Sequence, residues 1–185
     1  MGLPEYEVIE ALKGEKINLI ASFPCEKIKA LLWLVPKNFD HIPLTREENG
    51  VGICAGAYLA GARSMMLIQS SGLGTILNAL FSLSVTYELP LPIIASWRGL
   101  HDEKITAQIP LGRRIARILK TATIPLSAVQ DIGEIENVRI GVHDAFARNR
   151  PHVILITPSV WKDSRIETPE DSHFEERVVD RKSVV

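Results

Sequence analysis

Glu47 and Glu48 form a pair of carboxylates at the start of a stretch that carries almost no charge. From residue 49 to residue 87 the only charged side chain is that of Arg63, so the stretch is expected to be buried. A carboxylate at the edge of a buried segment can hold or move a proton for a bound ligand. The spacing of Thr45 and Glu48 offers a simpler role, because it matches a capping box in which the glutamate bonds only a backbone N–H group. Spacing alone favours the capping box and leaves the ligand role open.

Two loops with glycine or proline stand at the ends of other expected strands. The segment "SSGLG", residues 70–74, follows an apolar run, and its glycines would let a ligand approach the backbone and the free N–H groups of a helix start. It is not a dinucleotide fingerprint, because Leu77 occupies the place of the third glycine, and it could equally be a tight turn. In "FPCE", residues 23–26, Pro24 could shape a turn and Cys25 could be a small core residue.

Charged side chains gather after the expected strand at residues 91–97. Arg98 follows this apolar strand directly, which is costly unless its guanidinium meets an anion. That anion could belong to a ligand, or it could be Asp102 or Glu103 in an internal ion pair. Arg113 lies at the start of an expected helix, where a cation does not suit the helix dipole. The mismatch mildly favours an anionic partner for Arg113, although a solvated side chain is the commoner arrangement.

Apolar runs of strand length alternate with segments of helix length along the chain. The alternation predicts a three-layer α/β/α fold with a mainly parallel six-stranded sheet and right-handed crossovers. In such a sheet, ligands gather at the carboxyl ends of the strands, where the loops described above would meet. The expected strands are residues 17–23, 41–45, 64–70, 91–97, 124–129 and 152–157. The expected helices are residues 25–35, ended by Pro36, then 47–61, a segment from the "SGLG" turn to Thr86, 111–122 and 131–148.

The composition is that of an ordinary globular chain, with 185 residues, 46% of them hydrophobic and 23% charged. A formal net charge of −1 gives no broad attraction to nucleic acid or anionic lipid. We expect one domain at residues 1–160 and a charged tail at residues 161–185. No continuous apolar span of about twenty residues exists, so no membrane segment is predicted. The two cysteines are expected to be reduced thiols of a cytoplasmic protein.

Several familiar site motifs are absent from the sequence. The five histidines are scattered, and neither an HxxxH nor a CxxC pairing occurs, so no metal site is predicted within the chain. There is also no GxSxG elbow and no P-loop lysine. Metal-dependent, serine-nucleophile and nucleotide-hydrolysing sites of these types are therefore not expected from the chain's own motifs.

The segment "EENGVGICAGAYLAG", residues 47–61, resembles the glutamate-bearing helix in the pyrimidine-binding domain of thiamine-diphosphate enzymes. In that family an aromatic residue follows the glutamate by ten positions, a spacing shared by Glu48 and Tyr58 but not by Glu47. Together with "IQSSGLGTILNALFSL" and "SWRG…EKITAQIPLGR", the stretch is more closely similar to the α subunits of sulfopyruvate decarboxylases. The phosphonopyruvate decarboxylases share the pattern less tightly. The likeness covers residues 4–157.

The resemblance implies a catalytic role for Glu48. In the family, the glutamate hydrogen-bonds N1′ of the cofactor's aminopyrimidine, which favours the imino tautomer that removes the thiazolium C2 proton. The resulting ylide attacks a 2-oxo acid, and carbon dioxide leaves. The implied reaction converts sulfopyruvate to sulfoacetaldehyde in coenzyme M biosynthesis. A water-poor pocket would suit such a carboxylate, since burial strengthens its bond to N1′.

The resemblance also assigns binding roles to other residues. The residues expected to face the active site or border the aminopyrimidine are Pro24, Cys25, Ser70, Ser71, Gly72, Leu73 and Gly74. Sulfopyruvate has two anionic ends, for which the candidate donors are Arg98 and Arg113, with His101 and Gln108 as secondary candidates. Each donor could instead hold a subunit interface. Trp97 and Asn49 depart from the family pattern, so phosphonopyruvate, another 2-oxo acid, or a non-catalytic module with the same fold stay open as alternatives.

The second half of a thiamine-diphosphate site is missing from the sequence. That half binds Mg²⁺ and the diphosphate through a GDG-type motif, and this chain contains no Gly-Asp dipeptide. The resemblance therefore implies that a separate β subunit supplies the Mg²⁺ and diphosphate ligands. We expect the chain alone to be catalytically silent, to associate with itself, and to form a larger hetero-oligomer with the β subunit.

Overall fold

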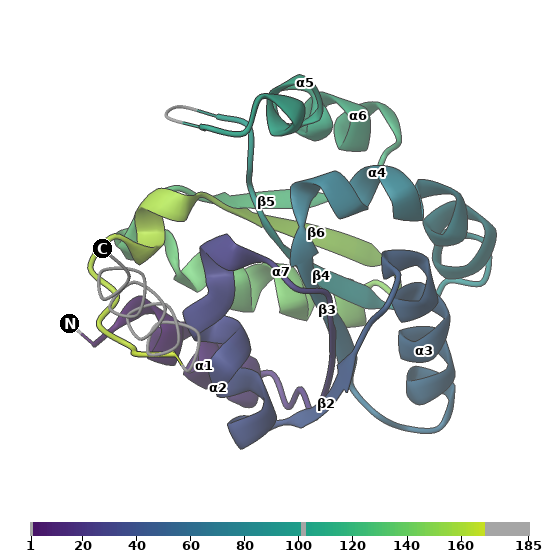
Figure 1. The fold of residues 1–185 in the computed structure, drawn as a ribbon. Coiled ribbons are helices and arrows are strands. Elements are labelled where there is room, and N and C mark those ends of the chain that lie inside the picture. Colours follow the sequence, from purple (N-terminus) through teal and green to yellow (C-terminus); the bar gives the residue numbers. More distant parts are fainter. Residues whose placement is uncertain (1, 101–102, 169–185) are drawn as a thin grey trace, which may run out of the picture.

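The computed structural model of the protein describes residues 2–100 and 103–168. A six-stranded sheet with the order β2-β1-β3-β4-β6-β5 runs through its centre, and every neighbouring pair of strands is parallel (Figure 1). The strands are β1 (Leu19–Ser22), β2 (Asp40–Pro43), β3 (Ser64–Gln69), β4 (Leu91–Ser96), β5 (Leu126–Val129) and β6 (Pro151–Ile156). The predicted parallel six-stranded sheet is confirmed, and each strand falls within or beside its expected range.

Helices cover both faces of the sheet. The α-helices are α1 (Pro4–Gly14), α2 (Lys29–Asn38), α3 (Glu47–Leu59), α4 (Ser70–Ala79), α5 (Ile109–Gly112), α6 (Ile115–Thr121) and α7 (Glu136–Ala147). Short 3-10 turns are η1 (Glu26–Ile28), η3 (Thr106–Gln108), η4 (Ile132–Glu134) and η5 (Pro158–Trp161), and η2 (Leu80–Val85) is a π-helix that extends α4. Helices α1, α2 and α7 pack on one face, and α3, α4 and α6 pack on the other.

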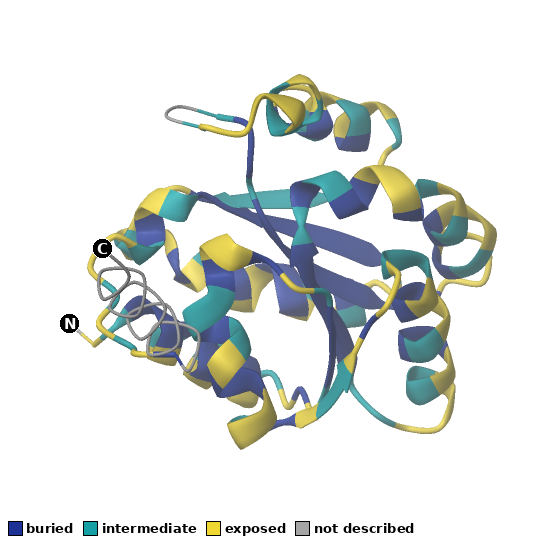
Figure 2. Ribbon diagram, viewed as in Figure 1, coloured by how far each residue is buried: buried dark blue, intermediate teal, exposed yellow. Residues whose placement is uncertain are grey.

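Successive strand residues point into two separate apolar cores, one on each face of the sheet. On β1, Ile20 belongs to the core under α1, α2 and α7, whereas Ala21 belongs to the core under α3, α4 and α6. On β3, Met65 and Met66 divide in the same way. Both faces of the central strands are therefore buried, as Figure 2 shows in dark blue, which explains why the strands read as continuous apolar runs.

Helix α3 packs closely on the sheet at one glycine. A Cβ atom on Gly50 would lie 2.6 Å from Cε of Met66 and 2.7 Å from Cδ1 of Leu44. At Gly52 and Gly56 an added Cβ would meet no atom within 4 Å. Of the small residues in this helix, Gly50 is thus the glycine whose missing side chain sets the distance between α3 and β3.

Several expected element boundaries are wrong. Helix α2 continues past Pro36 to Asn38, because a proline this close to a helix end removes only one late hydrogen bond. The expected helix at residues 111–122 is divided between α5 and α6. No separate turn precedes α4, which begins at Ser70 directly after β3. The amphipathic N-terminal residues form α1, with Pro4 at its first turn.

The described part of the expected tail still contacts the domain. Trp161 and Ile166 pack against the core under α1, α2 and α7, and Thr168 is buried. Residues 169–185 lie outside the described residues, so the division at residue 160 stays a prediction. Within the described ranges, no helix combines the length and the hydrophobicity needed to cross a membrane.

Candidate functional site

The carboxyl ends of β1, β3 and β4 bring three loops of the candidate site together. The loop after β1 carries Pro24 and Cys25, α4 starts with Ser70 directly after β3, and Arg98 follows β4. The backbone N–H of Arg98 donates a hydrogen bond to Oγ of Ser70 at 3.0 Å, so the ends of β3 and β4 are tied to each other. The expected convergence of these loops at one edge of the sheet is therefore observed.

Glu48 occupies the second position of α3 and keeps a partly exposed carboxylate. Its side chain is 33% exposed, and Oε1 accepts a hydrogen bond from Nη2 of Arg46 at 3.0 Å. Hydrogen bonds from its own backbone N–H and from Arg46 hold the pKa of the carboxyl below its usual range. Glu48 is therefore an ionised acceptor at neutral pH, and the expectation of a water-poor pocket is wrong for this chain alone, since the carboxylate lies at an open edge.

The capping box that the spacing favoured is not formed. Helix α3 begins at Glu47 with Arg46 as its N-cap, and the N-cap side chain makes no capping hydrogen bond. Thr45 lies outside the cap position and is exposed. The capping box with Thr45 is therefore not the role of Glu48, whose carboxylate accepts hydrogen bonds from its own backbone N–H and from a solvent-exposed arginine.

Glu47 and Glu48 have different surroundings. The side chain of Glu47 lies against Gly72 on α4, where an added Cβ would be 2.7 Å from Oε1 and 2.8 Å from Cγ of Glu47. Glu47 therefore packs the start of α3 against the start of α4, and only a glycine at position 72 permits this contact. Glu47, and not Glu48, therefore contacts a residue that the resemblance places beside the cofactor, and the choice of Glu48 as the functional acid stays a prediction.

The predicted cofactor-bordering residues of α4 differ in what they can offer a ligand. Ser70 is buried and bonded to Arg98, and Leu73 is fully buried in the core, so the Leu73 side chain cannot contact a cofactor. Ser71 is half-buried, and Gly74 is exposed beside Leu111, whose Cδ2 would lie 3.2 Å from an added Cβ. Ser71 and Gly74 are thus the positions where this segment can meet a ligand, because Gly72 is already covered by the Glu47 side chain.

Arg98 forms the internal ion pair that the sequence left open. Its Nε and Nη2 donate to the Glu103 carboxylate at 2.6 Å and 2.7 Å, and both side chains are nearly buried, at 5% and 6% exposure. The Arg98 hydrogen bond, helped by the backbone N–H groups of Ile105 and Gly99, lowers the pKa of Glu103 to about 2 against the effect of burial. Nε and Nη2 of Arg98 are therefore engaged by Glu103 and not by a substrate anion.

The other predicted substrate donors do not converge in the described structure. Gln108 ends η3 with its carbonyl close to Gly99. Arg113 is exposed at the C-terminal end of α5, so the argument that it opposes a helix dipole at a helix start is wrong. His101 lies outside the described residues. A role for Arg113, Gln108 or His101 in substrate binding stays a prediction.

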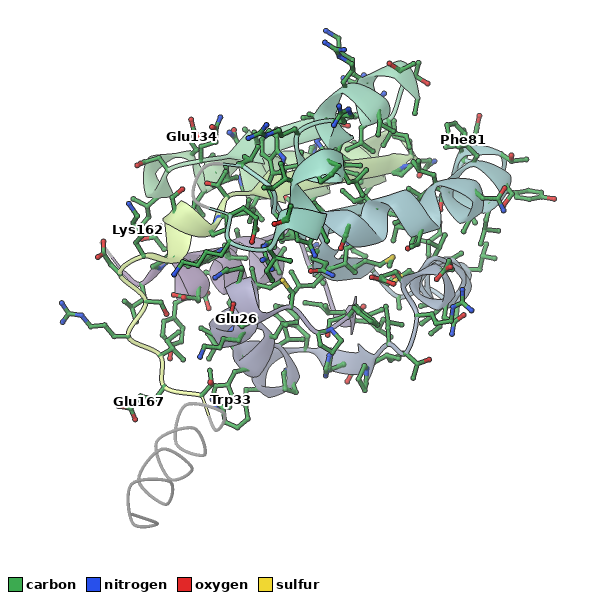
Figure 3. All side chains as sticks on the ribbon, turned by 45° about the horizontal axis from the view of Figure 1, so that its top comes forward. Glu26, Trp33, Phe81, Glu134, Lys162 and Glu167 are labelled. Atoms are coloured by element: carbon green, nitrogen blue, oxygen red, sulfur yellow. The ribbon has the colours of Figure 1, made fainter. Side chains whose placement is uncertain are left out.

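A cavity of about 630 Å³ adjoins the loop after β1 and was missed by the sequence analysis. It lies between α2 and the edge strand β2, and Figure 3 labels two of its lining residues, Glu26 and Trp33, on the α2 side of the molecule. Oγ of Ser22 and Nε2 of His41 are 2.7 Å apart at its wall, and burial lowers the pKa of His41. The lining residues are Ser22, Pro24, Cys25, Glu26, Lys29, Leu32, Trp33, His41, Pro43 and Thr168.

The cavity could not be predicted from motif spacing, because it forms only when β1, α2 and β2, which lie within residues 19–43, pack together and Thr168 approaches them. Pro24 and Cys25 line it, and their predicted place at the active site stays a prediction. Among the residues that the structure describes, no group of three or more His, Cys, Asp or Glu side chains could hold a metal ion. The features of the described residues that could meet a ligand are the ionised carboxylate of Glu48, the glycine-containing start of α4 and this cavity.

Solved structures with low sequence identity share the fold. A benzoylformate decarboxylase from Polynucleobacter necessarius matches 91% of this chain and 32% of its own, with a TM-score of 0.67 and 15% identity. A 2-oxoglutarate:ferredoxin oxidoreductase from Magnetococcus marinus matches 86% of this chain and 29% of its own, with a TM-score of 0.65 and 15% identity. At this identity the likeness concerns the fold alone. No family model matches the chain.

Curated relatives at higher identity carry a common name. A sulfopyruvate decarboxylase of Methanosarcina acetivorans is 52% identical over 87% of this chain, which spans only 42% of that protein's length. The sulfopyruvate decarboxylase subunit alpha of Methanocaldococcus jannaschii is 48% identical over 64% of this chain and 71% of its own. The corresponding subunit of Methanothermobacter thermautotrophicus is 34% identical over 83% of this chain and 95% of its own. The chain therefore belongs to the sulfopyruvate decarboxylase subunit alpha family.

Proposed function

We propose that the chain is the α subunit of a thiamine-diphosphate-dependent decarboxylase that converts sulfopyruvate to sulfoacetaldehyde and carbon dioxide. The observation that carries this proposal is the ionised, partly exposed carboxylate of Glu48, ten residues before Tyr58 at the open edge of a parallel sheet. Membership of the family supports the choice of substrate. A place in coenzyme M biosynthesis and in the cytoplasm belongs to the same proposal.

The residues at this edge fit the aminopyrimidine of the cofactor. Glu48 is an ionised acceptor that can hold a proton-bearing ring nitrogen, and the neighbouring Glu47 side chain lies against Gly72 at the start of α4. Ser71 and Gly74 are accessible beside it. When bound, thiamine diphosphate supplies the electron sink for decarboxylation. The chain's own contribution is to hold the ring and to stabilise one protonation state of it through Glu48.

The partner is proposed to be a β subunit that carries the Mg²⁺ and diphosphate ligands. The 185 residues contain no Gly-Asp dipeptide with which to build that half of the site. A partner placed over the open edge would also exclude water from Glu48, which would strengthen its hydrogen bond to the cofactor. We propose in addition that the chain associates with itself, because several large apolar side chains are exposed on α3, on η2 and just after η2, namely Leu59, Phe81, Val85 and Tyr87.

Substrate discrimination in the reconstituted complex tests this proposal. The chain is combined with a β subunit bearing a GDG motif, thiamine diphosphate and Mg²⁺, and carbon dioxide release is measured from sulfopyruvate, phosphonopyruvate and pyruvate. The proposal expects the highest kcat/KM with sulfopyruvate. Preference for phosphonopyruvate would indicate that the chain is part of a phosphonopyruvate decarboxylase instead. The absence of decarboxylation with all three substrates would indicate a non-catalytic module.

A further inference from the structure

We infer that Arg98 and Glu103 form a positioning pair that fixes the loop after β1 and the start of α4 around the candidate site. The inference rests on the proposed function for what the site binds. It replaces the prediction that Arg98 is a donor for the substrate. The pair acts through Cys25 and Ser70, which lie on two other strand ends.

The hydrogen-bonding capacity of the Glu103 carboxylate is satisfied within the chain. The Glu103 carboxylate accepts four hydrogen bonds, two from Arg98, one from the Gly99 N–H at 3.2 Å and one from the Ile105 N–H at 3.0 Å. Both charged groups are nearly buried, where an ion pair is tolerated only when its hydrogen-bonding capacity is satisfied. A substrate anion would have to displace a carboxylate that already holds four donors, so recognition of substrate by Arg98 is disfavoured.

Arg98 lies against two other segments, the start of α4 and the loop after β1. Its backbone N–H donates to Oγ of Ser70, the first residue of α4, and the Ser70 side chain is 1% exposed. Its guanidinium is also close to the thiol of Cys25 in the loop after β1. The hydrogen bond to Glu103 is the largest cause that raises the pKa of Arg98, and the Cys25 thiol is one of the lesser causes. One residue at the end of β4 therefore contacts both segments that are predicted to border the cofactor, and a change in its position would be transmitted to each of them.

The backbone around Arg98, at residues 97–99, packs tightly against residues 108–112. Gly99 has a φ of +80°, and a Cβ atom there would collide with the carbonyl of Gln108. A Cβ atom on Gly112 would collide with the carbonyl of Arg98, and Nε1 of Trp97 donates to the carbonyl of Gly112 at 3.0 Å. Arg98 is thus held by backbone contacts on both sides, as a positioning residue requires.

Hydrogen exchange on the full chain tests the inference without cofactor or partner. The first variant is Arg98→Lys, which keeps the positive charge but loses the paired guanidinium donors. The second is Glu103→Gln, which keeps the shape of the side chain but loses its negative charge. Arg150→Lys is the matched control, because Arg150 pairs with Asp144 at 2.9 Å. Arg150 lies just before β6, at the amino ends of the strands, whereas Arg98 lies at their carboxyl ends. We expect amides of residues 23–28 and 69–74 to exchange about tenfold faster in the first two variants and not in the control.

Exchange that accelerates only within residues 97–105 would overturn the inference, because the pair would then stabilise its own loop alone. Kinetics of the reconstituted complex give a second readout. We expect Arg98→Lys to lower kcat and to raise the half-saturating thiamine diphosphate concentration, each by about tenfold or more, with little change in the substrate KM. A rise in substrate KM alone would instead make Arg98 a substrate donor. If the wild-type complex does not decarboxylate, the proposed function fails, and hydrogen exchange still decides the positioning role.

Discussion

At the scale of single residues, the adjacent carboxylates of Glu47 and Glu48 are distinguished by their neighbours. Glu47 packs against the Cα of Gly72, whereas Glu48 keeps an ionised carboxylate with one hydrogen bond to an exposed arginine. The ten-residue interval to Tyr58 favours Glu48 as the functional acid, and this choice stays a prediction. Sequence could not reveal the Glu47–Gly72 contact, because it depends on how two helices on the same face of the sheet approach each other.

The ion pair of Arg98 marks the limit of residue-level prediction. The cost of burying a cation indicated that Arg98 must meet an anion, and the structure provides Glu103. Nothing in the local sequence chose between Glu103 and a ligand, because the four intervening residues can fold the chain either way. The cavity beside His41 was missed for a similar reason, since Ser22 and His41 meet only through the pairing of β1 and β2.

A buried histidine makes stability depend on pH. His152 bonds Ser127 at 2.9 Å and Asp144 at 2.8 Å, and burial lowers its pKa despite the Asp144 hydrogen bond. The unfolded chain, with a histidine pKa of about 6.5, therefore binds protons first as the pH falls. The free energy of unfolding should decrease as the pH is lowered from 7.5 to 5.5.

Urea unfolding at both pH values measures this effect. His41 has a pKa lowered by burial as well, so it contributes in the same direction. His152→Asn should reduce the difference in unfolding free energy between the two pH values. An unchanged difference in this variant, or greater stability of the wild-type chain at pH 5.5, would contradict the assignment.

At the scale of elements, alternating apolar runs were sufficient to predict the sheet. All six strands were expected, because strands buried on both faces have a composition that helices on the surface do not share. The boundaries that failed depend on contacts beyond the local pattern. The break at residues 113–114 accompanies the close contact between Gly112 and the loop after β4, and sequence periodicity contains no sign of that contact.

Helix α3 gives a matched test of close packing. Gly50→Ala should lower the free energy of unfolding by about 1–3 kcal/mol, because the new methyl group would overlap Met66 and Leu44. Gly52→Ala, in the same helix with open space around it, should raise stability by up to about 1 kcal/mol through helix propensity. Urea denaturation midpoints measure both. Equal effects of the two substitutions would show that the spacing between α3 and β3 is not set by Gly50.

At the scale of the whole molecule, the chain offers half of a site. The acid and the helix starts lie on an open edge, and the sequence provides no Gly-Asp motif for the diphosphate. Isothermal titration of the chain alone with thiamine diphosphate and Mg²⁺ should therefore show no tight binding, whereas the complex with the β subunit should bind. Tight Mg²⁺-dependent binding by the chain alone would contradict the shared site.

The most direct test of the account is the decarboxylation rate of the reconstituted complex with Glu48→Gln, compared with Glu47→Gln as the control. Loss of the ionised acceptor at position 48 should lower kcat by about 10²- to 10⁴-fold, with the unfolding midpoint nearly unchanged. Glu47→Gln should cost far less, since Glu47 serves packing. A Glu48→Gln complex with undiminished kcat would contradict the central claim that this carboxylate activates the cofactor.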